Sequence, residues 1–505
     1  MYINDKILIG KNENFEACLL PKMANRHGLI TGASGSGKTI TLKVLAESFS
    51  SAGVPVFLAD VKGDIGATAL AGESNESLEA RLEKLKIENF EYKNFPVRFW
   101  DIFGVSGHPI RTTLDSVGPE ILSMMLGLSE AQEGVLTIVY KIAQDNNWKL
   151  DDTKDLRLLL QYVGDNKNDF ITKYGNITTQ TIGVIQRCLL TLENQGADKF
   201  FGQPELDIND FIQIENGQGL INILHAVELF KSPDLYASFL LWLLTNLFNK
   251  MPEVGDLDKP RIVFFFDEAH LLFNGMPTYR LKQITQVVKL IRSRGIGLYF
   301  ISQSPTDIPD EIIAQLGNRV QHTLRAYTPA EQRTVKAAAD AFRTNPNFNT
   351  TEAILALGTG EALVSFQNEK GEPEIVEKVT ILPPQSKMGT IDDMTRNKII
   401  NTSTIVGKYD EAVERDSAYE ELNAMIKEKL EEEERIREEK ERIKQEELEE
   451  KEKLKKQKEE EKQKKEEERA RKNSIGYKVG KKVANKTLDR AINKGLNSIF
   501  KSIFK

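Results

Sequence analysis

The stretch "GASGSGKT" at residues 32–39 constrains the fold of this chain more than any other feature of the sequence. It fits the pattern GxxxxGK[ST], follows the short apolar run "GLIT" at 28–31 and precedes the helical pattern "KTITLKVLAESF". In this context the glycines allow backbone N–H groups to close around phosphate groups at a helix N-terminus, where the helix dipole favours negative charge. A strand, loop and helix in this order predict an α/β domain with a nucleotide phosphate site.

The side chains of this loop have distinct expected roles. The ammonium group of Lys38 is expected to reach the β- and γ-phosphates, and the hydroxyl of Thr39 to hold a magnesium ion. The residues expected to bind the nucleotide are Gly32, Ala33, Ser34, Gly35, Ser36, Gly37, Lys38, Thr39 and Ile40. The alternative is a glycine turn that precedes a helix and binds nothing.

A second acidic motif follows a strongly apolar run in "RIVFFFDEAHLL" at 261–272. A phosphate loop needs a carboxylate on a nearby strand to complete metal binding, and Asp267 is expected to act on the magnesium ion through a water ligand. Glu268 is expected to polarise the water that attacks the γ-phosphate, which favours hydrolysis over transfer to a second substrate. The alternative is an acidic helix cap after a core strand.

Two further motifs could complete the site. The apolar run "GLYFIS" ends just before Gln303, which could sense the γ-phosphate or could be an ordinary polar turn residue. Four arginines follow or precede this run, and one of them could reach a neighbouring subunit as an arginine finger, although most arginines only solvate a surface. These arginines are Arg292, Arg294, Arg319 and Arg325.

Short apolar runs alternate with helical patterns from about residue 26 to 385, which predicts an α/β core with a mostly parallel sheet. The core is expected to span 1–395, with a helical insertion at about 104–218, and to be followed by a linker at 396–410. The expected strands are 28–31, 54–60, 97–102, 219–224, 261–267, 297–302, 319–325 and 361–366.

Composition changes at residue 411, where Glu, Lys and Arg replace mixed sequence. Apolar residues in 411–472 are sparse and keep no steady heptad, which favours a single exposed helix with i,i+4 ion pairs and leaves a coiled coil as the alternative. The last segment, 473–505, carries eight Lys or Arg against Asp489 and has the spacing of a basic amphipathic helix. Such a tail could contact a protein partner or a membrane surface, or pack on the core.

Charge and cysteine content limit the class of protein. A formal net charge of −7 excludes a surface that is basic all over, but a local basic channel for nucleic acid stays open. The two cysteines, Cys18 and Cys188, have no metal-binding or disulfide spacing, which indicates a reducing, cytoplasmic setting. Neither a signal peptide nor a run of about 18 apolar residues is present, so we expect no membrane span.

Taken in order, "TGASGSGKT", "FFFDEAH" and "ISQSPTDIPDEIIAQLGNRVQHTLRAYTPAEQ" resemble the HerA/FtsK branch of RecA-like motor ATPases, and most of all the bacterial HerA-like ATPases with a helicase HerA-like C-terminal domain. The resemblance spans about residues 5–390. It implies a RecA-like P-loop fold, Mg²⁺-dependent ATP hydrolysis, a hexameric ring and a DNA translocase role. The tetrapeptide "DEAH" also resembles DEAH-box RNA helicases, but the other motifs of those helicases are missing.

The resemblance also implies roles for individual residues, and Arg325 matches the family's strand arginine better than the other three arginines do. Residues that match family positions are Lys38 and Thr39 of the phosphate loop, Asp267 and Glu268 of the acidic pair, the sensor Gln303, and Asp60 and Lys62 of "ADVKGD", to which no role is assigned. HerA proper has a β-barrel before its core, whereas 31 residues precede Gly32 here. Two other functions stay open: an ATP-driven protein-remodelling or assembly factor acting through the C-terminal segments, and a nucleotide-gated scaffold.

Overall fold

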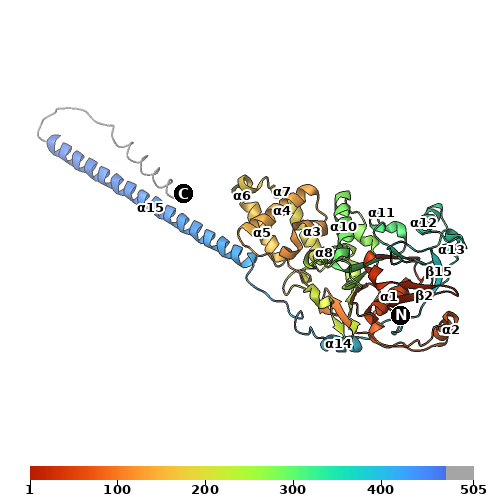
Figure 1. The fold of residues 1–505 in the computed structure, drawn as a ribbon. Coiled ribbons are helices and arrows are strands. Elements are labelled where there is room, and N and C mark those ends of the chain that lie inside the picture. The colour runs from red at the N-terminus through yellow and green to blue at the C-terminus, as the bar shows by residue number, and fades with distance from the viewer. Residues whose placement is uncertain (474–505) are drawn as a thin grey trace. The chain divides into compact units, whose positions relative to one another are not determined.

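The computed structural model describes residues 1–473, which belong to two compact units, Met1–Asn423 and Ala424–Lys505. Figure 1 shows the elements of both units. The basic tail predicted at 473–505 lies outside the described residues, except for its first position. None of the helices in the described part of the chain combines the length and the apolar character needed to cross a membrane.

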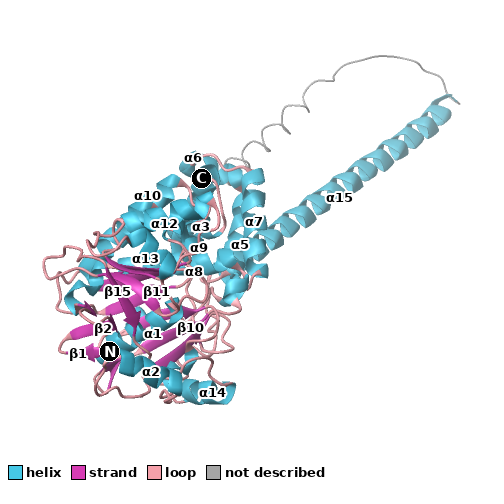
Figure 2. Cartoon of the chain, turned by 90° about the vertical axis from the view of Figure 1, so that its right-hand side faces the viewer, coloured by secondary structure: helices cyan, strands magenta, loops and turns pink. Residues whose placement is uncertain are grey.

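A large, mostly parallel sheet forms the centre of the first unit (Figure 2). Its strand order is β1-β2-β15-β14-β13-β4-β12-β11-β5-β10-β6-β7, and every pairing from β13 to β7 is parallel. The parallel strands are β4 (Gly28–Thr31), β5 (Val56–Asp60), β6 (Val97–Asp101), β7 (His108–Pro109), β10 (Ile221–His225), β11 (Ile262–Phe266), β12 (Ile296–Ser302) and β13 (Asn318–Gln321). The expected α/β fold with a mostly parallel sheet is confirmed.

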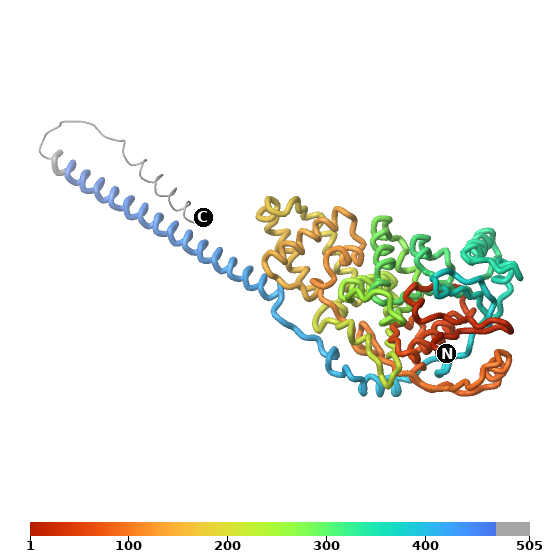
Figure 3. Tube along the Cα trace, in the orientation of Figure 1, coloured from red at the N-terminus to blue at the C-terminus, as the bar shows by residue number. Residues whose placement is uncertain are grey.

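The other end of the sheet is antiparallel. It contains β1 (Tyr2–Ile3), β2 (Lys6–Lys11), β3 (Glu16–Leu19), β14 (Glu361–Ser365) and β15 (Glu377–Ile381). The first residues of the chain thereby lie beside residues near 380, as Figure 3 shows. The expected strand at 319–325 is shorter than predicted, because β13 ends at Gln321 and the chain then turns over the phosphate loop.

Side chains on the two faces of the sheet enter two separate cores. In β11, Phe264 and Phe266 pack into one core and Phe265 into the other, since successive side chains of a strand point to opposite faces. All five residues of this strand are buried, which is the pattern of a central parallel strand covered on both faces. The helix α1 (Lys38–Ser51) contributes to one core and α8 (Pro233–Lys250) to the other.

Helices cover the sheet and fill the insertion. The insertion contains α3 (Leu114–Met125), α4 (Glu130–Asp145), α5 (Thr153–Asp165), α6 (Lys167–Tyr174) and α7 (Thr179–Asn194), followed by the small hairpin of β8 (Ile214–Glu215) and β9 (Gln218–Gly219). The remaining helices are α2 (Glu76–Leu85), α9 (His270–Phe273), α10 (Thr278–Ile291), α11 (Asp310–Ile313), α12 (Pro329–Asp340), α13 (Thr350–Ala356), α14 (Asp393–Asn401) and α15 (Ala418–Asn473). All helices of the insertion lie inside the predicted range 104–218.

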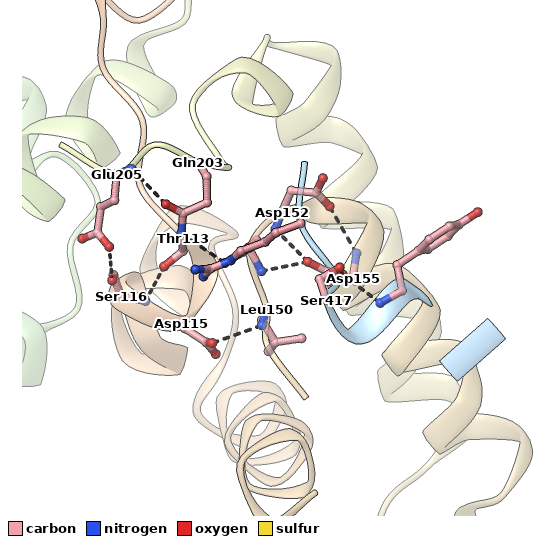
Figure 4. A network of polar contacts seen from close by, with 12 residues as sticks. Thr113, Asp115, Ser116, Leu150, Asp152, Asp155, Gln203, Glu205 and Ser417 are labelled. Atoms are coloured by element: carbon pink, nitrogen blue, oxygen red, sulfur yellow. Dashed lines mark hydrogen bonds and ion pairs between the residues drawn. The ribbon is translucent and has the colours of Figure 1, made fainter. Parts of the chain in front are cut away.

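The segment after α14, residues 402–417, is attached to the insertion, and we call it the strap. The side chain of Arg111 donates a hydrogen bond of 2.6 Å to the Tyr409 carbonyl, and Arg415 Nη2 donates one of 2.7 Å to Asp151 Oδ1. Ser417 Oγ donates a 2.6 Å hydrogen bond to Asp155 Oδ1 (Figure 4). The linker expected at 396–410 is therefore helix α14 followed by packed chain, and the charged helix begins at Ala418 and not at 411.

Candidate nucleotide-binding site

Strand order brings three predicted motifs to one edge of the sheet. Strand β12 lies between β4 and β11 and pairs in parallel with both. The phosphate loop follows β4, Gln303 follows β12, and the acidic pair follows β11. Carboxyl ends of adjacent parallel strands meet at the same edge, where open α/β sheets bind their ligands. Motifs more than 200 residues apart in the chain thus become neighbours in space.

The phosphate loop requires glycine at two positions for different reasons. Gly37 directly precedes α1 with a φ of 114°, in the left-handed region that favours glycine. A Cβ atom on Gly32 would lie 2.5 Å from the Cβ of His322, closer than two such atoms can approach. Outside the loop, the Thr323 carbonyl accepts a 2.9 Å hydrogen bond from Ala33 N–H. The loop is therefore shaped by its neighbours before any ligand binds.

Lys38 and Ser36 carry polar groups suited to a phosphate. Lys38 Nζ donates hydrogen bonds to the carbonyls of Gly32 at 2.6 Å and Ala33 at 3.1 Å, so the ammonium lies over the loop. Burial lowers the pKa of Lys38, although the neighbouring Glu268 and Asp267 oppose this shift. Ser36 Oγ is buried without a hydrogen-bond partner among the described residues, and a bound phosphate oxygen would satisfy it. These groups fit a nucleotide phosphate.

His322, for which the sequence predicted no role, packs against the phosphate loop. Its Nδ1 lies 2.9 Å from the Glu361 carbonyl, which can only accept, so Nδ1 carries the hydrogen. Its Nε2 must then accept the 2.8 Å hydrogen bond from the Thr41 hydroxyl on α1. Burial lowers the pKa of His322 to about 4, which agrees with a neutral ring. The ring thereby connects the first turns of α1 to β14.

The acidic pair follows β11 in a tightly held turn. Tyr236 Oη donates a 2.8 Å hydrogen bond to the Asp267 carbonyl, and Ala269 N–H donates one of 2.9 Å to the Ile301 carbonyl of β12. Burial and the adjacent Glu268 raise the pKa of Asp267 to about 6, so a cation here would stabilise the ionised form. Thr39, half-buried in the first turn of α1, is the hydroxyl expected to share that cation. The carboxylate and hydroxyl are ligand types that Mg²⁺ prefers.

Gln303 and the four candidate arginines differ in their exposure and in the contacts that their side chains already make. Gln303 is exposed directly after β12. Arg319 donates to three backbone carbonyls, Arg292 pairs with an aspartate at 3.2 Å, and Arg294 lies 4.4 Å from the centre of an aromatic ring. Arg325 is exposed in the loop after β13 and lines a cavity of about 470 Å³ with the phosphate-loop residues 33–36. Of the four, Arg325 alone lines the phosphate loop, and within residues 1–473 its side chain has no hydrogen-bond or ion-pair partner.

Asp60, which matched a family position without an assigned role, stabilises a turn. Its carboxylate ends β5 and accepts hydrogen bonds from the backbone N–H groups of Gly63 at 2.7 Å and Ile65 at 3.0 Å. Burial raises its pKa, and those hydrogen bonds oppose the shift. Lys62 lies exposed in the same turn. The motif "ADVKGD" therefore shapes the loop next to β11.

Comparisons with known proteins agree with one another on the family. The family model described as "Helicase HerA-like C-terminal" matches residues 5–503. A protein of Sulfurisphaera tokodaii named "DNA double-strand break repair helicase HerA" is 22% identical over 373 residues, which cover 71% of this chain and 66% of that protein. A protein of the same name from Sulfolobus acidocaldarius is 23% identical over 71% of this chain and 65% of its own length. The match thus spans just under two thirds of these relatives.

Solved structures also match over most of the chain. Plasmid coupling protein TrwB in complex with ADP and Mg²⁺ is 14% identical, with a TM-score of 0.44, over 72% of this chain and 88% of that one. VirB4 of Thermoanaerobacter pseudethanolicus is 15% identical, with a TM-score of 0.44, over 78% of this chain and 99% of that one.

Proposed function

This chain belongs to the helicase HerA-like C-terminal family, as its motifs suggested, and from that membership we propose that it is an ATPase that requires Mg²⁺ and couples hydrolysis to movement on DNA or DNA processing. The observation that supports the proposal best is the meeting of the phosphate loop with the Asp267–Glu268 pair at one edge of the sheet. A phosphate-binding loop alone would equally suit a kinase, whereas a buried glutamate beside it suits hydrolysis.

In the proposed reaction each side chain has one task. Lys38 leaves the carbonyls of Gly32 and Ala33 and binds the β- and γ-phosphates, while backbone N–H groups of the loop surround them. Thr39 and, by way of water, Asp267 would hold a magnesium ion, which would supply positive charge to offset that of the phosphates. Glu268 accepts a proton from the attacking water, and Gln303 orients the γ-phosphate.

The proposed DNA activity rests on the relatives, which are named as DNA double-strand break repair helicases. We propose that identical subunits form a hexameric ring, as the family resemblance implies. In this ring Arg325 contacts the nucleotide that is bound to the neighbouring subunit. Its exposed side chain beside the phosphate loop supports this role. The two cysteines are unpaired, which agrees with a reducing, cytoplasmic setting.

A second function is supported by the strap. Residues 402–417 connect α14 to the charged helix and are held on the insertion by hydrogen bonds and ion pairs. Such an arrangement suits an ATP-driven remodelling or assembly factor whose protein partner binds the C-terminal segments. This candidate needs the same ATPase site but no DNA.

The ATPase rate of the purified protein, measured at low salt with and without double-stranded DNA, separates the two candidates. DNA stimulation that falls steeply as salt rises supports the DNA motor, because phosphate contacts release counterions. An unchanged rate favours the remodelling factor. Lys38→Ala is expected to abolish turnover, and Glu268→Gln to retain nucleotide binding while turnover falls to a small residual rate. Turnover at the wild-type rate in Glu268→Gln would contradict the hydrolytic site itself.

A further inference from the structure

Glu268 has a strained backbone. Its φ is 48°, in the left-handed region that residues with side chains rarely adopt. Such a conformation is energetically costly and persists only where surrounding contacts impose it. Here Glu268 N–H donates a 2.9 Å hydrogen bond to Asp267 Oδ1, and the next residue, Ala269, is tied to β12. The turn therefore holds the Glu268 side chain in a direction that an ordinary strand end would not give.

The carboxylate of Glu268 lacks a donor on one side. The side chain is only 11% exposed, and Oε2 is buried without a hydrogen-bond partner among the described residues. His270 Nδ1 lies 3.4 Å from this oxygen and also has no hydrogen-bond partner there. Two buried polar atoms that lie close together without forming a hydrogen bond are costly to leave unpaired. A small approach of the two groups would satisfy both.

Neighbouring donors are already engaged. Tyr236 Oη binds the Asp267 carbonyl, and Lys38 Nζ binds the loop carbonyls of Gly32 and Ala33. When a nucleotide binds, Lys38 turns to its phosphates and stays unavailable to Glu268. His270 Nδ1, 3.4 Å from Oε2, is a nearby donor that has no hydrogen-bond partner among the described residues.

The position of His270 is well defined by the chain around it. It begins α9, and its carbonyl accepts a 3.1 Å hydrogen bond from Asn274 N–H. Leu272 and Phe273 of the same helix are buried in the core. The imidazole therefore has a fixed base and only its side-chain torsions are free.

On the premise of the proposed hydrolysis, we propose that His270 is a positioning residue for Glu268. Its ring, which carries a hydrogen on Nδ1 in this role, donates to Glu268 Oε2 when the site closes on a nucleotide. The carboxylate is then fixed with Oε1 toward the attacking water, which transfers its proton to that oxygen as the water oxygen bonds to the γ-phosphorus and the bond to ADP breaks. His270 contacts neither substrate nor metal.

Three single variants test this role in the full-length protein. His270→Phe keeps a ring but removes the donor, His270→Asn keeps an N–H near the position of Nδ1, and Asn274→Ala is an exposed control on the same turn. We expect His270→Phe to lower kcat by about tenfold while KM and the affinity for a non-hydrolysable ATP analogue stay unchanged, because only an interaction needed in the transition state is lost. His270→Asn should recover most of kcat, and Asn274→Ala should equal the wild type.

A double variant then shows whether His270 acts through Glu268. In the Glu268→Gln background, His270→Phe should cause no further loss of the residual turnover, since groups that act as a unit are not additive. Losses that multiply, or a raised KM with unchanged kcat, would overturn the inference. So would wild-type turnover in His270→Phe alongside an inactive Glu268→Gln, with the proposed function intact. Absence of any turnover that depends on Lys38 would instead overturn the proposed function and this inference with it.

Discussion

At the scale of single residues, the buried histidines His27 and His322 make the free energy of unfolding depend on pH. The His322 ring accepts from Thr41 and donates to the Glu361 carbonyl, and the His27 ring accepts from the Leu298 N–H at 3.1 Å. Burial lowers the pKa of each to about 4, from an ordinary value of 6.5. Neither ring can take a second proton without losing a hydrogen bond that it accepts.

The sign of the pH effect follows from these lowered pKa values. In the unfolded chain both rings bind a proton near pH 6.5, whereas in the folded chain they stay neutral down to about pH 4. Their contribution is therefore fully present above pH 6.5 and is lost as the pH falls toward 4, by about 3 kcal/mol for each ring. We expect His322→Gln, which keeps one donor and one acceptor, to flatten this fall. Denaturant unfolding at several pH values measures it, and an unchanged slope would contradict a neutral buried His322.

Some residues of the site could be predicted from the sequence, and others could not. Lys38, Asp267 and Glu268 could be predicted because their chemistry fixes both residue type and spacing within a short segment. His322 could not, since its partners Thr41 and Glu361 lie far from it in the chain and become neighbours only in the folded sheet. The surrounding sequence "RVQHTLR" is mostly polar, so it gave His322 no distinguishing signal.

At the scale of elements, α1 is anchored by a buried carboxylate. Glu47 accepts hydrogen bonds from Gln385 N–H at 2.7 Å, from Ser386 N–H at 3.2 Å and from the Ser386 hydroxyl at 2.5 Å. One turn earlier on the helix, Lys43 donates to the Lys387 carbonyl. These contacts tie the helix behind the phosphate loop to the segment that follows β15.

Removing this anchor should be costly. We expect Glu47→Ala to lower the free energy of unfolding by about 3 kcal/mol, because backbone N–H groups and the Lys43 ammonium lose a buried partner. Glu47→Gln keeps an acceptor and should cost clearly less. Chemical denaturation of the two variants provides the comparison. Equal losses would mean that the charge and not the hydrogen bonding holds the helix.

A second prediction at this scale concerns the strap. Arg415 pairs with Asp151, just before α5. Ser417 pairs with Asp155 in the first turn of α5 (Figure 4). We expect Ser417→Ala to lower the midpoint of thermal unfolding, since a buried hydrogen bond to a charged group contributes about 1.5–3 kcal/mol. Thr402→Ala, at an exposed position of the strap, is the control. Limited proteolysis should cut the strap faster in Ser417→Ala, and an unchanged cutting rate would count against a docked strap.

Elements were predictable where one pattern was enough to identify them. The eight expected strands are present because a central parallel strand such as β11 is apolar on both faces. The antiparallel strands β1, β2, β3 and β15 were missed, since they mix polar and apolar residues as loops do. The strap was missed for another reason: its anchor Arg415 lies in a stretch as rich in charge as the exposed helix that follows.

At the scale of the whole molecule, a ring would place Arg325 at the nucleotide of a neighbouring subunit. We predict that Arg325→Ala and Glu268→Gln subunits are each inactive alone and that a mixture recovers part of the activity, because an active site can then combine one intact residue from each. ATPase rates across mixing ratios measure this. Arg319→Ala, which removes an arginine bound within its own chain, should gain nothing from mixing. Inactivity at every ratio of the Arg325 mixture would argue that Arg325 serves its own phosphate loop.

The strand order also determines how long β4 lacks its neighbouring strands while the chain is being synthesised. Strand β4, which leads into the phosphate loop, lies between β12 and β13, and β12 begins about 265 residues later in the chain. At ~5–20 residues per second, a ribosome needs roughly 13 to 53 seconds to supply those neighbours. During this delay β4 has neither of its partners, and its apolar edges can pair with another nascent chain. The phosphate loop is thus translated long before the strands that complete it as a binding site.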